Sequence, residues 1–246
     1  IYISNETLRH SNFKLLNKSL YDKNWYKRIN QKNLKNIDLL ISDNLPEAVL
    51  LNKKTIIFAN FFWHEIFNLK NKFFKDLENK LCENKIKVLS NYMFGSIKSS
   101  KIKIIKIGFI GKFLNENKSK ANGILISLGT SKIGYKKNLN ILSKIINNRS
   151  YKNYQFYVDK NLIRNKRSLP KNIKIANFSN QMFKKIKIAL IKPGFSTIQD
   201  CLRRGIPIVS YLGNYNEEFL NNAKILRKNK IGKYFFNFDA ALKEIF

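Results

Sequence analysis

Residue types that bind phosphate and ribose occur together in the segment Ile188–Asp200. A short apolar run there leads through a Pro-Gly pair into a helical pattern. Ser196 and Gln199 have the spacing of an S-x-x-Q capping box and predict the helix start. The first N–H groups of such a helix bind anions, and Gly194 would let a phosphate approach the backbone. Asp200 could accept hydrogen bonds from ribose hydroxyls. The alternative is that the glycine and the serine only make a tight turn.

A second junction of this kind lies upstream, where the apolar run Gly123–Ser127 ends in the small-residue loop Gly129-Thr130-Ser131. Either loop alone is weak evidence, because glycine turns are common in α/β proteins. Two such loops in one predicted domain favour a phosphate-binding site. A polar segment, residues 213–218, follows and leads into a predicted helix that contains Asn222-Ala223.

From residue 123 to residue 232 the motifs resemble the C-terminal domain of GT-B glycosyltransferases of the MurG-like group, the family 28 type. The resemblance implies a UDP-sugar type donor as a substrate and no cofactor. In that family two loops hold the donor diphosphate, an acidic residue holds the ribose, and a polar segment contacts the sugar. The implied diphosphate-binding residues are Gly129, Thr130, Ser131, Gly194, Phe195, Ser196 and Thr197. The implied ribose-binding residue is Asp200, and the implied sugar-binding residues are Asn214, Glu217 and Glu218.

Two positions depart from the family pattern. Thr130 stands where the first loop usually has its second glycine. Glu217-Glu218-Phe219 stands where the sugar-contacting segment usually has a glutamine. Carboxylates also bind sugar hydroxyls, so a nucleotide-sugar remains the expected class of ligand. The identity of the donor sugar, for which an N-acetylhexosamine is one candidate, stays open.

The N-terminal half carries polar residues at the ends of two apolar runs, Asp43-Asn44 after the first and His64 after the second. Ligands of open α/β sheets bind beyond such strand ends. The resemblance implies that Asp43 and Asn44 contact the acceptor and that His64 or Glu65 is the catalytic base. Alternatively, Asp43 caps a helix and His64 is an ordinary residue at a helix start. The family's glycine-rich loop does not precede Asp38, so we expect an N-terminally truncated chain whose base could lie outside it.

Short Ile-, Val- and Phe-rich runs alternate with helical patterns, which predicts βαβ units and parallel sheets. Their near-continuous hydrophobicity predicts strands buried on both faces. One amphipathic helix is expected from Trp63 to Leu81. The predicted strands are 38–42, 55–59, 87–90, 102–107, 123–127, 155–158, 173–176, 188–191 and 206–211.

The polar stretch 111–122 is the best candidate for a linker. We therefore expect a partial N-terminal domain over residues 1–112 and a nucleotide-sugar-binding domain over residues 113–246. The resemblance makes the expected fold α/β and GT-B, with two Rossmann-like domains whose parallel sheets face a cleft. The N-terminal domain of this pair would be incomplete.

The formal charge of +31 comes from 47 basic and 16 acidic residues. Because the lysines are scattered rather than interleaved with stacking aromatics, a solvated basic surface is favoured over a nucleic-acid site. Such a surface would attract an anionic membrane. Cys82 and Cys201 are isolated, which fits a reducing, cytoplasmic compartment. No apolar run reaches the roughly 18 residues of a transmembrane helix.

The leading interpretation is an inverting cell-envelope hexosyltransferase that acts on a lipid-linked or other acceptor at the inner membrane surface. No Asp-x-Asp pair occurs, so we expect no metal and a leaving diphosphate stabilised by helix ends. One alternative is a nucleotide-sugar hydrolase or epimerase on the same fold. Another is a basic nucleic-acid-binding module.

Overall fold

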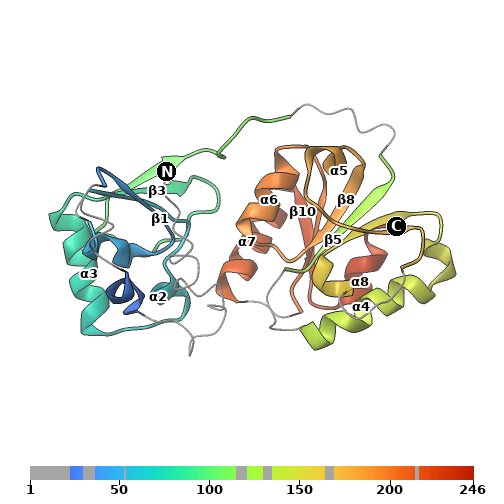
Figure 1. The fold of residues 1–246 in the computed structure, drawn as a ribbon, viewed down its shortest axis with the longest axis horizontal. Coiled ribbons are helices and arrows are strands. Elements are labelled where there is room, and N and C mark those ends of the chain that lie inside the picture. The colour runs from blue at the N-terminus through green and yellow to red at the C-terminus, as the bar shows by residue number, and fades with distance from the viewer. Residues whose placement is uncertain are drawn as a thin grey trace. The chain divides into compact units, whose positions relative to one another are not determined.

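The computed structural model describes residues 23–29, 37–52, 54–114, 121–129, 135–163, 169–213 and 216–246. The chain divides into two compact units, Ile1–Phe109 and Ile110–Phe246, each built on a parallel sheet (Figure 1). The sequence placed this boundary after residue 112. No helix within these residues combines the length and the apolar character that crossing a bilayer demands.

Unit 1 contains a four-stranded parallel sheet in the order β1-β2-β3-β4. Its core lies between this sheet and helix α3, where Phe74, Leu77 and Leu81 pack with Ile57 and Val88 of the strands. The strands are β1 (Leu40–Asp43), β2 (Thr55–Phe58), β3 (Lys87–Asn91) and β4 (Ile104–Ile107). The helical segments are η2 (Trp25–Arg28), η4 (Pro46–Leu50), α2 (Trp63–Ile66) and α3 (Lys72–Glu83).

Unit 2 contains a six-stranded parallel sheet in the order β10-β9-β8-β5-β6-β7. The strands are β5 (Gly123–Ser127), β6 (Gln155–Val158), β7 (Ile173–Ile175), β8 (Ile186–Ile191), β9 (Ile208–Tyr211) and β10 (Gly232–Phe235). The chain runs outward from β5 through β6 to β7, then returns to the other side of β5 and runs outward again through β8 to β10. The topological switch point of this doubly wound sheet therefore lies between β5 and β8.

Helices cover both faces of the unit 2 sheet. α4 (Tyr135–Asn147) and α8 (Phe238–Lys243) pack on one face, and α6 (Phe195–Leu202) and α7 (Glu217–Lys228) lie on the other (Figure 1). The remaining helical segments are η5 (Arg149–Tyr151), η6 (Lys160–Ile163) and α5 (Asn180–Lys184). This arrangement confirms the predicted α/β class with parallel sheets.

Burial of the strands matches the sequence prediction best in β5, at the middle of the unit 2 sheet, and differs most at the edges of the sheets. Every residue of β5 is buried, as continuous hydrophobicity predicts for a strand covered on both faces. β1 lies at an edge of the sheet formed by the described residues of unit 1, and its Ile41 is 54% exposed. Hydrophobic runs therefore identified these strands without revealing which of them lie at an edge.

Two local predictions were wrong. The single helix expected from Trp63 to Leu81 is two helices, because the chain leaves α2 after Ile66 and Asn68 adopts a positive φ of 51°. The side chain of Asn71 then caps α3 by accepting a hydrogen bond of 3.3 Å from the N–H of Phe74. β10 was not predicted, because its sequence Gly-Lys-Tyr-Phe begins with a glycine and a lysine and contains no Ile or Val.

Candidate functional site

The loops that follow β5 and β8 lie side by side at the switch point of unit 2. These two strands pair in parallel, with Ser127 opposite Ile191, and the N–H of Lys192 donates to the carbonyl of Ser127 at 2.8 Å. Gly129 and Gly194, predicted from separate motifs, therefore stand at neighbouring strand ends. Crevices at such points are where open α/β sheets bind ligands.

Helix α6 begins at Phe195, and Gly194 is its N-cap residue. The carbonyl of Gly194 accepts the first helical hydrogen bond, from Ile198 at 3.1 Å. The predicted capping box was therefore wrong: Ser196 lies inside the first turn, and Gln199 accepts a bond from Ile110 instead. The N–H groups of Ser196 and Thr197 have no partner within the helix, as is general for a first turn, and can bind an anion.

The turn after β5 is held by a carboxylate that the sequence prediction did not include. Asp159, which follows β6 and is 3% exposed, accepts hydrogen bonds from Leu128 (2.7 Å) and Gly129 (3.1 Å). Burial raises the pKa of Asp159, although these bonds and one from Ser127 act in the opposite direction. Gly129 has a φ of +86°, which favours glycine. Thr130 and Ser131 lie outside the described residues.

Lys192 places a positive charge between the two glycine loops, and the sequence prediction also missed it. Its Nζ lies 4.4 Å from the centre of the Phe219 ring, and its Cδ lies beside Gly129. Burial lowers the pKa of Lys192, and the nearby Glu218 partly offsets this effect. The position of the lysine directly before Pro193-Gly194 was the available sequence signal.

Asp200 lies on α6 and pairs with Arg204 one turn later, with 3.1 Å between Oδ1 and Nη1. Arg204 is buried, with 7% of its surface exposed. Its guanidinium group lies over the ring of Phe183 and also donates a hydrogen bond of 2.6 Å to the side chain of Asn180. The side chain of Asp200 is 38% exposed. One carboxylate oxygen is thus oriented by Arg204, while the side chain remains accessible to a ligand.

The start of α7 packs against the Pro-Gly turn. Asn222 donates from its side chain to the carbonyl of Pro193 at 3.0 Å, and Asn216 caps the helix through the N–H of Phe219. Glu218 is buried and Glu217 is exposed in the first turn of this helix. Asn214, the third residue predicted to contact the sugar, lies outside the described residues.

In unit 1, asparagine side chains link the carboxyl ends of three neighbouring strands. Asn44 donates to Asp43 at 2.9 Å and accepts from the N–H of Asn60 at 3.2 Å, and Asn60 in turn accepts from the N–H of Asn91 at 3.0 Å. Asp43 does not cap a helix, because the N-cap of η4 is Leu45 and makes no side-chain bond. The alternative interpretation of Asp43 was therefore wrong.

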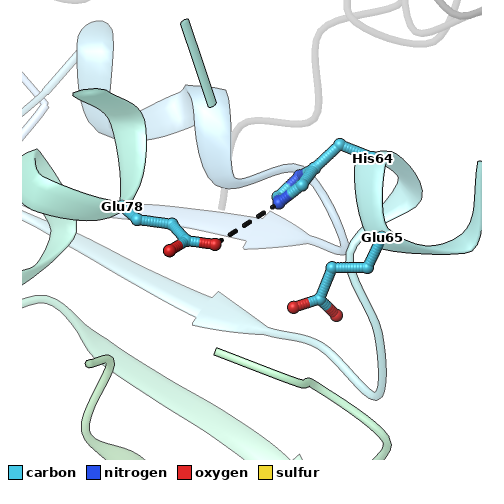
Figure 2. Close-up of side chains that lie close together, drawn as sticks. All are labelled: His64, Glu65 and Glu78. Carbon is cyan, nitrogen blue, oxygen red and sulfur yellow. Dashed lines mark ion pairs between the residues drawn. The ribbon is translucent and has the colours of Figure 1, made fainter. Parts of the chain in front are cut away.

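His64 is buried inside unit 1 rather than displayed at its surface. Its ring stacks between Phe62 and Phe74, with centroid separations of 5.6 and 4.5 Å, and the residue is 5% exposed. Burial lowers the pKa of His64 to about 4. Glu65 and Glu78 are its titratable neighbours (Figure 2). The imidazole is therefore neutral at physiological pH, and its role as a base remains a prediction.

No family model matches the chain, and no curated protein sequence matches it significantly. Solved glycosyltransferase structures do match. The spinosyn forosaminyltransferase SpnP has a TM-score of 0.55 and 12% identity over 93% of this chain and 69% of its own. The spinosyn rhamnosyltransferase SpnG, in its complex with thymidine diphosphate, has a TM-score of 0.54 and 13% identity over 96% and 69%. SnogD from Streptomyces nogalater has a TM-score of 0.50 and 12% identity over 87% and 68%.

At this level of identity, the likeness concerns the fold. The chain has the α/β fold of GT-B glycosyltransferases and spans about two thirds of the length of these structures.

Proposed function

We propose that the chain is part of an inverting glycosyltransferase that uses a UDP-sugar type donor. The observation that carries the proposal is the switch point of unit 2, where Gly129, Lys192 and the start of α6 lie together at neighbouring strand ends. A lysine and the N–H groups of a helix start are both suited to a diphosphate. The SpnG complex supports the same ligand class, because its nucleotide is a diphosphate.

The proposed donor site assigns a role to Lys192 and to each residue that the sequence predicted for donor binding. Ser196, Thr197 and Lys192 bind the diphosphate, and Asp200 accepts hydrogen bonds from the ribose while Arg204 orients it. Glu217 and Glu218, at the start of α7, contact the donor sugar, and the same role is proposed for Asn214, which lies outside the described residues. Gly129 and Gly194 let the phosphates approach the backbone, and Phe195, Thr130 and Ser131 complete the loops.

The proposed reaction is a single in-line displacement at the anomeric carbon. The leaving diphosphate is stabilised by the helix start and by Lys192, with no divalent cation at the phosphates. Asp43 and Asn44 contact the acceptor, and His64 or a residue outside the chain takes the acceptor's proton. We further propose a MurG-like, lipid-linked acceptor at an anionic membrane surface, because a formal charge of +31 attracts such surfaces.

Calorimetric titration of the full chain with UDP and with thymidine diphosphate tests the donor site. We expect binding of at least one nucleotide, and we expect Asp200→Ala to weaken it by about 1.5 to 3 kcal/mol, the loss of a hydrogen bond to a charged group. Asp239→Ala is the matched control, because Asp239 is an exposed carboxylate of unit 2 that pairs with Lys144. Circular dichroism verifies that both variants are folded.

Two results would contradict the proposal. One is no nucleotide binding by the full chain, together with salt-sensitive nucleic-acid binding that Asp200→Ala leaves unchanged. The other is full-rate release of free sugar from a bound nucleotide-sugar without any acceptor, which would identify a hydrolase instead of a transferase.

A further inference from the structure

Three side chains in unit 1 gather potential metal-ligand atoms in one place. His64 and Glu65 project from α2, and Glu78 projects toward them from α3 (Figure 2). One ligand atom from each residue lies within 4.8 Å of the other two. This cluster is confined to unit 1, so it is separate from the donor site in unit 2. It shares His64 with the proposed transfer reaction, in which His64 is one of two candidates for the base.

The atoms that face the centre of the cluster lack partners. Neither ring nitrogen of His64 accepts or donates a hydrogen bond, although the side chain is only 6% exposed. Oε2 of Glu65 is also buried without a partner. Oε1 of Glu78 lies 3.8 Å from Nε2 of His64, which is too long for a hydrogen bond. Unsatisfied buried polar atoms are costly, so their convergence on one point calls for a ligand.

The opposite oxygens of both carboxylates are fixed by the segment before β4. Oε1 of Glu65 accepts from the N–H groups of Lys98 (3.0 Å) and Ser99 (3.2 Å). Oε2 of Glu78 accepts from the hydroxyl of Ser99 at 3.2 Å. Each carboxylate is therefore anchored through one oxygen and offers the other to the cluster. Metal-binding carboxylates are typically oriented in this way by outer hydrogen bonds.

The charges in the cluster also favour a cation. Glu65 and Glu78 place two carboxylates beside one imidazole. Among the ion pairs of the described residues, no lysine or arginine pairs with either carboxylate, even in a chain with 47 basic residues. Neither ring nitrogen of His64 is engaged in a hydrogen bond, so an imidazole lone pair is available to a metal.

We propose that His64, Glu65 and Glu78 bind a divalent first-row transition cation, for which Zn²⁺ is the test ion. An imidazole nitrogen with two carboxylates suits such ions, whereas Mg²⁺ and Ca²⁺ prefer oxygen ligands alone. A tetrahedral Zn²⁺ ion would hold its ligand atoms about 3.3 Å apart. Side-chain rotations that move the carboxylate oxygens of the two glutamates by about 1 Å would therefore close the site. The ion joins α2 to α3 and, with three protein ligands, retains a position for water.

Metal titration of the full chain, stripped with a chelator and desalted, tests this site. We expect one equivalent of Zn²⁺ to compete with a chromogenic chelator, and Co²⁺ to give an absorption band that Zn²⁺ abolishes. Glu78→Gln should weaken Zn²⁺ binding at least 100-fold. Glu83→Gln is the matched control, because Glu83 is an exposed glutamate at the end of the same helix. His10→Gln, which removes the only other histidine of the sequence, should leave binding unchanged.

Several outcomes would overturn the proposal: no Zn²⁺ or Co²⁺ binding by the wild-type chain, unchanged affinity in Glu78→Gln, or loss of binding in His10→Gln. Displacement of Zn²⁺ by equimolar Mg²⁺ would refute the transition-metal class. If Glu78→Gln does not fold, Glu65→Gln takes its place, and the paramagnetically shifted imidazole proton signals of the Co²⁺-bound wild-type chain decide whether an imidazole coordinates the ion. Nucleotide binding in unit 2 is measured in parallel, and its presence or absence leaves this result unaffected.

Discussion

Replacing Lys192 by methionine removes the positive charge between the two glycine loops and keeps a side chain of similar length. A half-buried ammonium at about 4 Å from a phosphate gains about 4 kcal/mol of Coulomb energy at an effective dielectric constant of 20. Desolvation of the lysine and its existing attraction to Glu218 reduce this gain. We therefore take the range for a charged hydrogen bond, about 1.5 to 3 kcal/mol. The Kd for UDP should rise about 10- to 150-fold.

Lys187→Met provides the matched control for this substitution. Lys187 is exposed near the start of β8, the strand that Lys192 follows. Five residues of extended strand place it about 16 Å away, which is about two Debye lengths at physiological salt. Both variants lower the net charge of the chain by one, so the comparison cancels the general attraction of a basic protein for an anion.

Calorimetric titration with UDP at pH 7 measures both variants beside the wild-type chain. Because burial lowers the pKa of Lys192, wild-type affinity should fall as the pH rises through that lowered value, and Lys192→Met should remove this dependence. The reasoning is refuted if Lys192→Met binds UDP within about twofold of wild type, or if Lys187→Met weakens binding equally.

Two further predictions concern the stability of the two units. Both tryptophans lie in unit 1, so tryptophan fluorescence reports on the unfolding of that unit alone. Asp159→Ala leaves the N–H groups of Leu128 and Gly129 unpaired, so urea unfolding followed by circular dichroism should show unit 2 destabilised by about 2 to 4 kcal/mol. An unchanged unit 2 transition, or an equal shift in tryptophan fluorescence, would contradict that role. Burial raises the pKa of Glu47 from 4.5 to about 8, so the carboxyl group keeps a proton in the native state that the unfolded chain releases. The free energy of unfolding of unit 1 should therefore fall by about 2 kcal/mol between pH 6.5 and 8. Glu47→Gln should abolish this loss in urea titrations followed by tryptophan fluorescence, and an equally steep loss in the variant would exclude Glu47 as its source.

The sequence by itself determined the strands β1 to β9 and the two glycine turns. These features are local: a run such as Gly123–Ser127 is apolar at nearly every position, and a glycine after it marks the end of the strand. The α/β class with parallel sheets followed from the alternation of such runs with helical patterns. β10 was not predicted, because Gly-Lys-Tyr-Phe begins with a glycine and a lysine and lacks the Ile- and Val-rich run that marked the other strands.

Only the tertiary structure decided which residues meet. The strand order places β8 beside β5, which brings Lys192 to Gly129 across 62 intervening residues. It also brings Asp159, which follows β6, to the same turn. The start of α6 also differs from the prediction, because the helix begins at Phe195 with Gly194 as its N-cap and no side chain caps it. Glu78 is separated from His64 by a helix break that the periodicity of the sequence did not reveal. Side-chain contacts of this kind depend on how helices and strands pack, and residue spacing along the chain does not encode them.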